Sequence, residues 1–197
     1  LSLVGSEMCI RDRSVALHGE LAGILMESNV IARAARLANA LNDLGPEDVP
    51  AVVTILDAGA PGMGSVEASL LVRFWGLHDP VAAAEWTIQH SAPISTRPIV
   101  AETAIETLAI SNPQLARDLM DGYVLSVSGL MGEIVQAALV RGWFISGEPG
   151  LIEFIKEMGP ASPQRRHVEI ILNEMIHRDG LEVTVQWLED FPDDDVR

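Results

Sequence analysis

Apolar residues recur along the chain at the spacing that lines one face of an α-helix. Eight successive stripes follow the i, i+3, i+4, i+7 pattern closely. Strand-like alternation is confined to one short run, from Leu181 to Trp187. We therefore predict an all-α fold. The stripes consist of Leu17, Leu21, Ile24 and Leu25; Val30, Ala34, Leu37, Ala38 and Leu41; Leu71, Phe74, Trp75 and His78; Ala101, Ala104, Ile105 and Leu108; Leu115, Ala116, Leu119, Met120 and Tyr123; Ile134, Val135, Ala138 and Leu139; Leu151, Phe154, Ile155 and Met158; and Val168, Ile171, Leu172 and Met175.

Proline and glycine interrupt this pattern at a nearly constant interval. Pro46, Pro80, Pro113, Pro149 and Gly180 are separated by 34, 33, 36 and 31 residues. A residue before proline is driven out of the α region, so a helix tends to end there and another to start. Regular self-similarity at this interval is typical of stacked helix–turn–helix repeats. The breaks predict antiparallel helix pairs with a period of about 34 residues.

Each predicted repeat holds a long helix, a turn and a second helix of roughly 10–12 residues. The best-matched copies are residues 74–86 and 107–119, and looser copies are residues 142–154 and 174–187. Pro50 is an alternative start for the first of the second helices, and it would make the first step 30 residues. Segments that link one repeat to the next are expected at residues 59–65, 91–97, 126–129 and 159–163.

Serine or threonine residues that precede a proline predict where two of the long helices begin. Ser162 before Pro163 suits an N-cap and a first helical position, because that proline has no N–H group to leave unpaired. Ser95 or Thr96 before Pro98 can cap another helix in the same way. Both sites therefore predict the start of a repeat.

The shared motif of these copies is an aromatic residue, then Asp-Pro or Asn-Pro, then an aromatic residue or leucine. This pattern resembles the bacterial α-helical repeat proteins of the tetratricopeptide and HEAT type, over most of residues 27–190. The tetratricopeptide signature Trp-x2-Leu-Gly-x2-Tyr is absent, so neither family is assigned. The resemblance implies an α-solenoid. An irregular helical bundle around a single core is the alternative.

The first thirteen residues, LSLVGSEMCIRDR, resemble the translated end of a transposon-derived sequencing adapter. We expect residues 1–13 to be a non-native segment and residues 14–197 to form a single helical-repeat domain. That domain would lack cysteine, since Cys9 is the one cysteine of the chain, and disulfide or thiolate chemistry would be excluded. One repeat period before Pro46 falls at the boundary between residues 1–13 and the rest of the chain. We therefore expect a fragment that is truncated at both ends, with apolar surface exposed at each end.

Composition limits the class of protein and its partners. The chain has 197 residues, of which 48% are hydrophobic, enough to form a core without disulfides or metals. Its 28 acidic and 13 basic residues give a net charge of −15, which argues against nucleic-acid binding. The longest apolar run, Leu21 to Met26, is far shorter than the ~20 residues that cross a bilayer. We expect neither a nucleic-acid partner nor a membrane-spanning segment.

Two segments have the spacing of ligand sites but lack the remainder of each motif. Glu174-x-x-His177, with His167 before it, has the spacing of di-iron bundles, yet the second such motif and its partner carboxylates are missing. We therefore interpret it as a solvated polar face. The glycine-rich residues 59–65 lack the preceding strand and the Lys-Ser/Thr pair of a phosphate loop. A linker between repeats is the preferred interpretation.

Two carboxylate pairs, Glu102/Glu106 and Glu153/Glu157, lie one helical turn apart. We expect them on outward polar faces, because acid–base catalysis needs a carboxyl group in an apolar pocket with a shifted pKa. The acidic residues 189–195 are interpreted as a solvated linker, with binding of a basic partner as the alternative.

Four tryptophans recur near the repeat breaks. Core packing between repeats is favoured over a cofactor or sugar platform, because large aromatic side chains fill the junctions of helix pairs. These residues are Trp75, Trp86, Trp143 and Trp187.

These observations favour a non-catalytic scaffold that binds another protein or peptide, with a preference for basic partners, through the groove of the solenoid. We predict no catalytic, cofactor-binding or metal-binding residues. One alternative is the superhelical, non-catalytic segment of a larger enzyme, for example one of the cell envelope, similar in role to that of lytic transglycosylases. A second alternative is a metalloenzyme that uses His167, Glu174 and His177.

Overall fold

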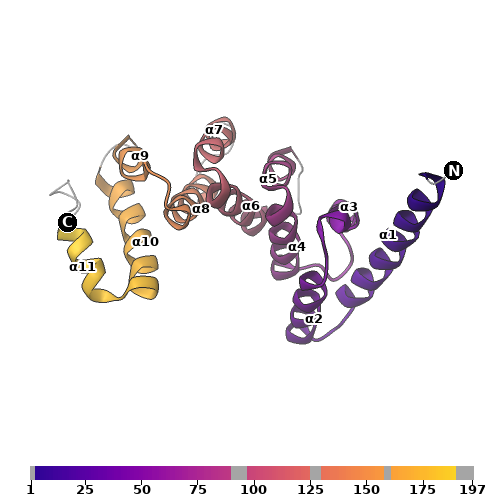
Figure 1. Cartoon of the computed structure of the whole chain (residues 1–197). Helices are drawn as coiled ribbons and strands as arrows, with labels where there is room; N and C mark the ends of the chain where they lie inside the picture. The colour runs from indigo at the N-terminus through magenta and orange to yellow at the C-terminus, as the bar shows by residue number, and fades with distance from the viewer. Residues whose placement is uncertain (1–2, 90–96, 125–129, 158–160, 190–197) are drawn as a thin grey trace. The chain divides into compact units, whose positions relative to one another are not determined.

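A computed structural model describes residues 3–89, 97–124, 130–157 and 161–189. Within these ranges the chain is all-α, with eleven α-helices, one short 3-10 helix and no strand (Figure 1). The prediction of an all-α fold is confirmed. The helices are α1 (Leu3–Leu25), α2 (Val30–Asn42), the 3-10 helix η1 (Pro46–Asp48), α3 (Val49–Ala58), α4 (Ser65–His78), α5 (Pro80–Gln89), α6 (Arg97–Ser111), α7 (Pro113–Val124), α8 (Leu130–Ser146), α9 (Leu151–Glu157), α10 (Ala161–Asp179) and α11 (Leu181–Glu189).

The Asx-Pro breaks fall between helices, as predicted. Asp79 separates α4 from α5, and its carboxylate accepts a hydrogen bond from the backbone N–H of Ala82 at 3.0 Å. Asn112 separates α6 from α7, and its side chain accepts from the N–H of Leu115 at 3.0 Å. Each Asx side chain satisfies a donor that the new helix leaves unpaired. Gly180 likewise separates α10 from α11.

Other predicted boundaries differ from the structure. Helix α10 begins at Ala161, so Ser162 is not an N-cap and Pro163 occupies the third helical position. Proline is tolerated there because the first turn of a helix has no intrahelical acceptors to lose. Near Pro50, a 3-10 turn starts at Pro46 and α3 then starts at Val49, so neither proline is the first residue of α3. The proposed cap at Ser95 or Thr96 lies outside the described residues.

The described parts of the second helices are 7 to 12 residues long. Helices α3, α5 and α7 have 10, 10 and 12 residues, whereas α9 and α11 have 7 and 9. Of the expected links, 59–65 joins α3 to α4, with Ser65 already in α4. Most of the other three expected links lie outside the described residues. No described helix combines the length and apolarity that crossing a membrane would require.

The chain divides into two compact units, residues 1–104 and 105–197, with α6 contributing to both. In the first unit, α1 packs on α2 and α3, while α4 packs on α2, α3 and α5. The core of this unit is mainly aliphatic, with Leu21, Leu37, Ile55, Leu71 and Val72 almost fully buried. Phe74 and Trp75 also belong to it. Most of the apolar residues in the stripes predicted for α1, α2 and α4 lie in or against this core, but Val30 and His78 are exposed. The buried face of α3, which includes Ile55, belongs to none of the predicted stripes.

In the second unit, α8 packs on α7, α9 and α10, and α10 also packs on α9 and α11. Helices α10 and α11 form an antiparallel hairpin at the C-terminal end (Figure 1). Leu139, Trp143, Ile155 and Ile171 are among its most buried side chains. Gly142 of α8 lets this helix approach α6 closely, because a Cβ atom there would lie 2.5 Å from the Glu106 carbonyl oxygen.

Buried carboxylates hold helices of the first unit together. Glu67 of α4 is 1% exposed, and one of its oxygens accepts a hydrogen bond from Nε of Arg33 in α2 at 2.7 Å. The other oxygen accepts from the backbone N–H of Gly64 at 2.9 Å. Asp48 repeats this arrangement, since it accepts from the Gly45 N–H at 3.1 Å and from Arg13 of α1 at 2.8 Å.

A related arrangement links three helices of the second unit. Arg141 of α8 donates to the buried carboxylate of Glu106 in α6 at 2.8 Å. Its Nε atom lies 3.5 Å from a carboxylate oxygen of Glu174 in α10. The expectation that Glu106 faces outward is wrong, because an arginine 35 residues away compensates its charge and permits burial.

The Glu67 carboxylate should make stability depend on pH. Its burial opposes ionisation, but the hydrogen bonds from Arg33 and from backbone N–H groups, with the Arg33 charge, outweigh burial and lower the pKa of Glu67 below its ordinary value of 4.5. The unfolded chain therefore takes up this proton first as the pH falls. The stability that Glu67 contributes is present above about pH 4.5 and is lost as the pH falls through the lower, folded-state pKa.

We expect the Glu67→Gln variant to be less stable than the wild type near neutral pH, and to lose less stability on acidification. Urea denaturation of both proteins at about pH 7, pH 5 and pH 3 measures the difference. The other carboxyl groups are the same in both proteins, so their contributions cancel in the difference between the two free energies of unfolding. Identical pH dependence in the two proteins would contradict the role assigned to Glu67.

Candidate functional site

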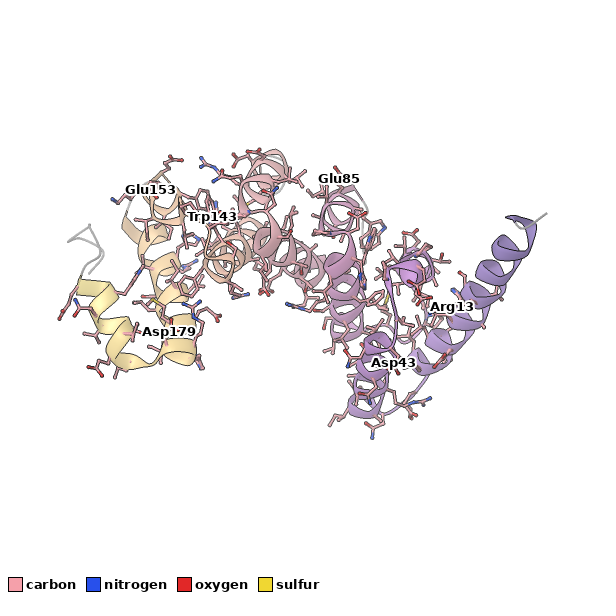
Figure 2. The ribbon with its side chains drawn as sticks, in the orientation of Figure 1. Arg13, Asp43, Glu85, Trp143, Glu153 and Asp179 are labelled. Carbon is pink, nitrogen blue, oxygen red and sulfur yellow. The ribbon has the colours of Figure 1, made fainter. Side chains whose placement is uncertain are left out.

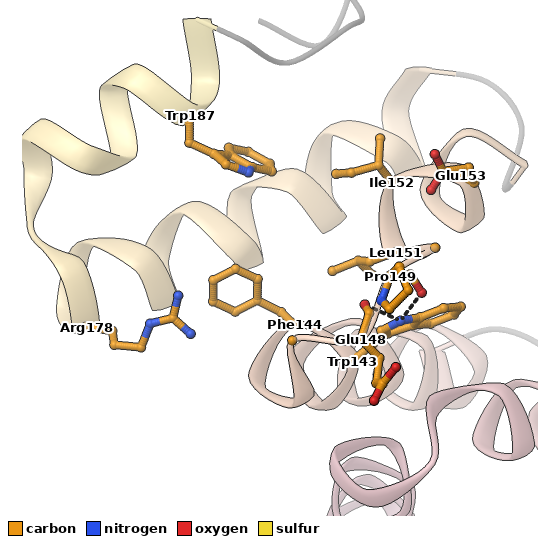
Figure 3. A pocket seen from close by; sticks show the side chains of 11 residues that line it. Trp143, Phe144, Glu148, Pro149, Leu151, Ile152, Glu153, Arg178 and Trp187 are labelled. Carbon is orange, nitrogen blue, oxygen red and sulfur yellow. Dashed lines mark hydrogen bonds between the residues drawn. The ribbon is translucent and has the colours of Figure 1, made fainter.

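The second unit contains a pocket of about 470 Å³ formed by the end of α8, the turn that follows, α9, and the facing parts of α10 and α11 (Figure 3). This volume lies within the range of small-ligand and side-chain sites. Most of its lining is apolar or aromatic, and three charged side chains join it. The lining residues are Trp143, Phe144, Gly147, Glu148, Pro149, Gly150, Leu151, Ile152, Glu153, Arg178 and Trp187.

The floor of the pocket is the turn between α8 and α9. Helix α8 ends at Ser146, and its hydroxyl donates to the Trp143 carbonyl at 2.7 Å and accepts from the Glu148 N–H at 3.1 Å. The Trp143 indole N–H donates to the carbonyls of Glu148 and Pro149, at 3.1 and 3.2 Å. Gly150, with φ of 98°, then leads into α9. The tryptophan side chain thus fixes the path of this turn.

Aromatic packing makes the floor rigid from below. Trp143 is 1% exposed and stacks on Phe154 of α9, with ring centroids 5.3 Å apart. The guanidinium of Arg117 in α7 lies 5.1 Å from the Phe154 ring centroid and pairs with Glu157 at 2.7 Å. These contacts hold the α8–α9 turn and α9 against α7.

The opposite wall comes from α10 and α11. Trp187 of α11 faces the cavity across from Phe144 of α8 (Figure 3). Arg178 of α10 stacks 4.7 Å from the Phe144 ring centroid. It also donates to both carboxylate oxygens of Asp179, at 2.7 to 3.0 Å. This hydrogen-bonded pair raises the pKa of Arg178 and lowers the pKa of Asp179, so both groups stay charged.

Two carboxylates remain at the rim. Glu148 and Glu153 are exposed, and neither forms an ion pair with any described residue. Glu157, one turn beyond Glu153 on α9, is paired with Arg117 instead. Figure 2 labels Trp143, Glu153 and Asp179, which belong to α8, α9 and α10 of this unit. The pocket therefore presents aromatic walls and an acidic rim.

The structure separates the residues of the di-iron-like spacing. His167 is buried, which contradicts its interpretation as part of a solvated face. His177 is exposed and its Nδ1 atom lies 2.7 Å from the Asn173 carbonyl oxygen, whereas Glu174 faces Arg141. Among the described residues no group of three His, Cys, Asp or Glu side chains is placed to hold a metal ion.

The glycine-rich residues 59–65 follow a helix and not a strand. Gly59, with φ of 57°, ends α3, and Gly64 precedes α4. The segment links α3 to α4. Of the carboxylate pairs, Glu102 is half-buried, and Glu153 and Glu157 are exposed as expected.

The tryptophans have two different roles. Trp75 of α4 is buried and lies against Trp86 of α5, with centroids 5.8 Å apart. Trp86 also donates to Asp57 of α3 at 2.7 Å. Trp75 and Trp143 are buried between helices, whereas Trp86 and Trp187 are half-buried. Trp143 and Trp187 both line the pocket. Sequence reasoning missed the pocket because its residues belong to four helices.

Comparisons with protein-family models, with curated proteins and with solved structures find no match to this chain. Inference about the function of this protein therefore rests on its own helices and pocket.

Proposed function

We propose that the helices form an α-solenoid of antiparallel helix–turn–helix repeats with a period of about 34 residues. The support comes from side-chain pairs that join one long helix to the next. Arg33–Glu67 and Ser69–Thr103 are each separated by 34 residues, Glu106–Arg141 by 35, and Arg166–Glu133 by 33. In a repeat array, equivalent positions of neighbouring modules lie side by side, so contact separations cluster at the period. A bundle around one core would give scattered separations.

Helix packing within each unit supports the same arrangement. The helices that pack together lie one or two positions apart in the chain, for example α2 with α4 and α8 with α10. Nearest-neighbour packing of this kind is the defining property of solenoids. The chain lacks the tetratricopeptide signature, so we propose helical repeats without a tetratricopeptide or HEAT assignment.

We further propose that the chain is a non-catalytic scaffold that binds another protein or a peptide. The observation that carries this proposal is the preformed pocket with Trp187 and Phe144 on facing walls (Figure 3). Tryptophan, tyrosine and arginine in well-packed pockets are the residues that most often dominate binding energy at protein interfaces. In solenoids such sites lie on the surface that successive modules build together.

Selection of a displayed random-peptide library on the purified chain tests this function. We expect enriched peptides that bind the chain, and we expect Trp187→Ala to weaken their binding at least about tenfold, as for an interface hot spot. Trp86→Ala is the matched control, since Trp86 is also a half-buried tryptophan on a second helix but lies outside the pocket. Absence of enriched peptides, or equal losses in both variants, would refute the proposal.

A further inference from the structure

The charges around the pocket indicate the chemistry of its partner. The three charged lining residues are Glu148, Glu153 and Arg178. Arg178 is already engaged, because Asp179 binds it with both oxygens and the Phe144 ring covers it. Its positive charge is therefore compensated within the protein. The carboxylates of Glu148 and Glu153 have no such partner among the described residues, so the rim is negative.

Both carboxylates lie on the α8–α9 side of the aromatic cavity (Figure 3). Glu148 belongs to the turn that carries Pro149, and Glu153 is the third residue of α9, next to Ile152 (Figure 3). The apolar space between Trp187 and Phe144 lies between these positions and α10. A side chain inserted in this space would bring the residues on either side of it near the two carboxylates.

The size of the cavity limits what can enter it. A volume of about 470 Å³ accommodates one large side chain and adjoining backbone, whereas a folded domain could meet only the rim. Trp187 and Phe144 offer ring faces that favour an aromatic or large aliphatic side chain. Like the acidic rim, the net charge of −15 favours positively charged partners, because it attracts positive segments and speeds their encounter with the chain.

We propose that this pocket binds a basic segment of another protein, with one bulky apolar side chain inserted between Trp187 and Phe144 and with arginine or lysine residues held at Glu148 and Glu153. This inference rests on the proposed peptide-binding function and specifies the partner. The inserted side chain supplies most of the affinity, and the two carboxylates supply the preference for basic sequence and the dependence on salt.

The experiment uses the full chain and a short synthetic peptide with a central phenylalanine flanked by arginines, measured by isothermal titration calorimetry. Two peptide variants accompany it, one with alanine in place of phenylalanine and one with glutamates in place of the arginines. The double variant Glu148→Gln/Glu153→Gln removes the rim charges from exposed side chains. Asp118→Asn/Asp121→Asn is its matched control, since these exposed carboxylates of α7 do not line the pocket.

We expect the rim double variant to weaken binding of the basic peptide about five- to tenfold, and the α7 control to change it less than about twofold. The difference should shrink at high salt, because exposed charges are then screened. Both peptide variants should bind at least about tenfold more weakly than the parent peptide. Equal effects of the two double variants would assign the attraction to overall charge and overturn the proposal.

The peptide variants keep the test independent of folding in the mutants. Equal binding of the arginine and glutamate peptides would overturn the proposed partner by itself. A library that yields tight binders without basic residues would also overturn it, while leaving the peptide-binding function intact. Failure of the library to yield any binder would instead remove the proposed function and this inference together.

Discussion

Replacement of Arg33 by methionine is expected to destabilise the protein by about 3–5 kcal/mol, because it leaves the carboxylate of Glu67 without its cation. Glu67 is 1% exposed and the Arg33 side chain is 12% exposed, so water cannot take over the role of the guanidinium. Arg33 also donates to the Glu27 carbonyl, just beyond the end of α1, at 2.8 Å. Urea denaturation near neutral pH measures the loss.

The double variant Arg33→Met/Glu67→Met is the control for this prediction. When both partners become apolar side chains of similar size, the desolvation cost disappears with the ion pair, and such exchanges are often nearly neutral. We therefore expect the double variant to recover most of the stability lost in Arg33→Met. If the single and double variants unfold at the same urea concentration, then the loss in Arg33→Met does not come from an uncompensated carboxylate.

The helices could be predicted from the sequence because their signals are local. Apolar spacing depends only on residues within two turns, and the breaks at Asp79 and Asn112 depend on one dipeptide each. The same locality explains the error at Ser162. A serine before proline has the composition of a cap, but a helix start is fixed by backbone geometry over a whole turn.

Burial of charge could not be predicted, because it depends on contacts distant in sequence. Glu106 has the local pattern of an outward-facing residue, yet Arg141 compensates it from another helix. Its position would have been recognisable only from a repeat alignment that places residues 35 apart side by side. The buried position of His167 has the same origin, since local spacing alone does not define which face another helix covers.

The sequence identified two of the aromatic residues that line the pocket, but it did not predict the pocket itself. The sequence marked Trp143 and Trp187 as residues near repeat breaks and favoured core packing for both. Packing is correct for Trp143, which stacks on Phe154. Trp187 is only half-buried and lines a cavity that Trp143 also borders, because α11 packs on α10 and leaves space beside the α8–α9 turn. Shape of this kind arises from helix lengths and crossing angles, which composition does not encode.

Substitution of Gly142 by alanine is expected to destabilise the second unit, although alanine favours helix formation by about 1 kcal/mol over glycine. The added Cβ atom would lie 2.5 Å from the Glu106 carbonyl oxygen and 2.6 Å from the Ala109 side chain. Backbone cannot yield as a flexible side chain does, so α8 and α6 must separate and their buried contacts loosen. Overpacking of this kind costs about 1–3 kcal/mol, which outweighs the gain in helix propensity.

Gly23 of α1 provides the matched control, because it is also within a helix but a Cβ atom there would have no neighbour within 4 Å. Gly23→Ala should therefore raise stability by about 0.5–1 kcal/mol, while Gly142→Ala lowers it. Urea denaturation of the two variants beside the wild type compares the signs directly. Stabilisation by both substitutions would mean that α6 and α8 do not approach closely at Gly142, and the contact between these successive long helices would have to be abandoned.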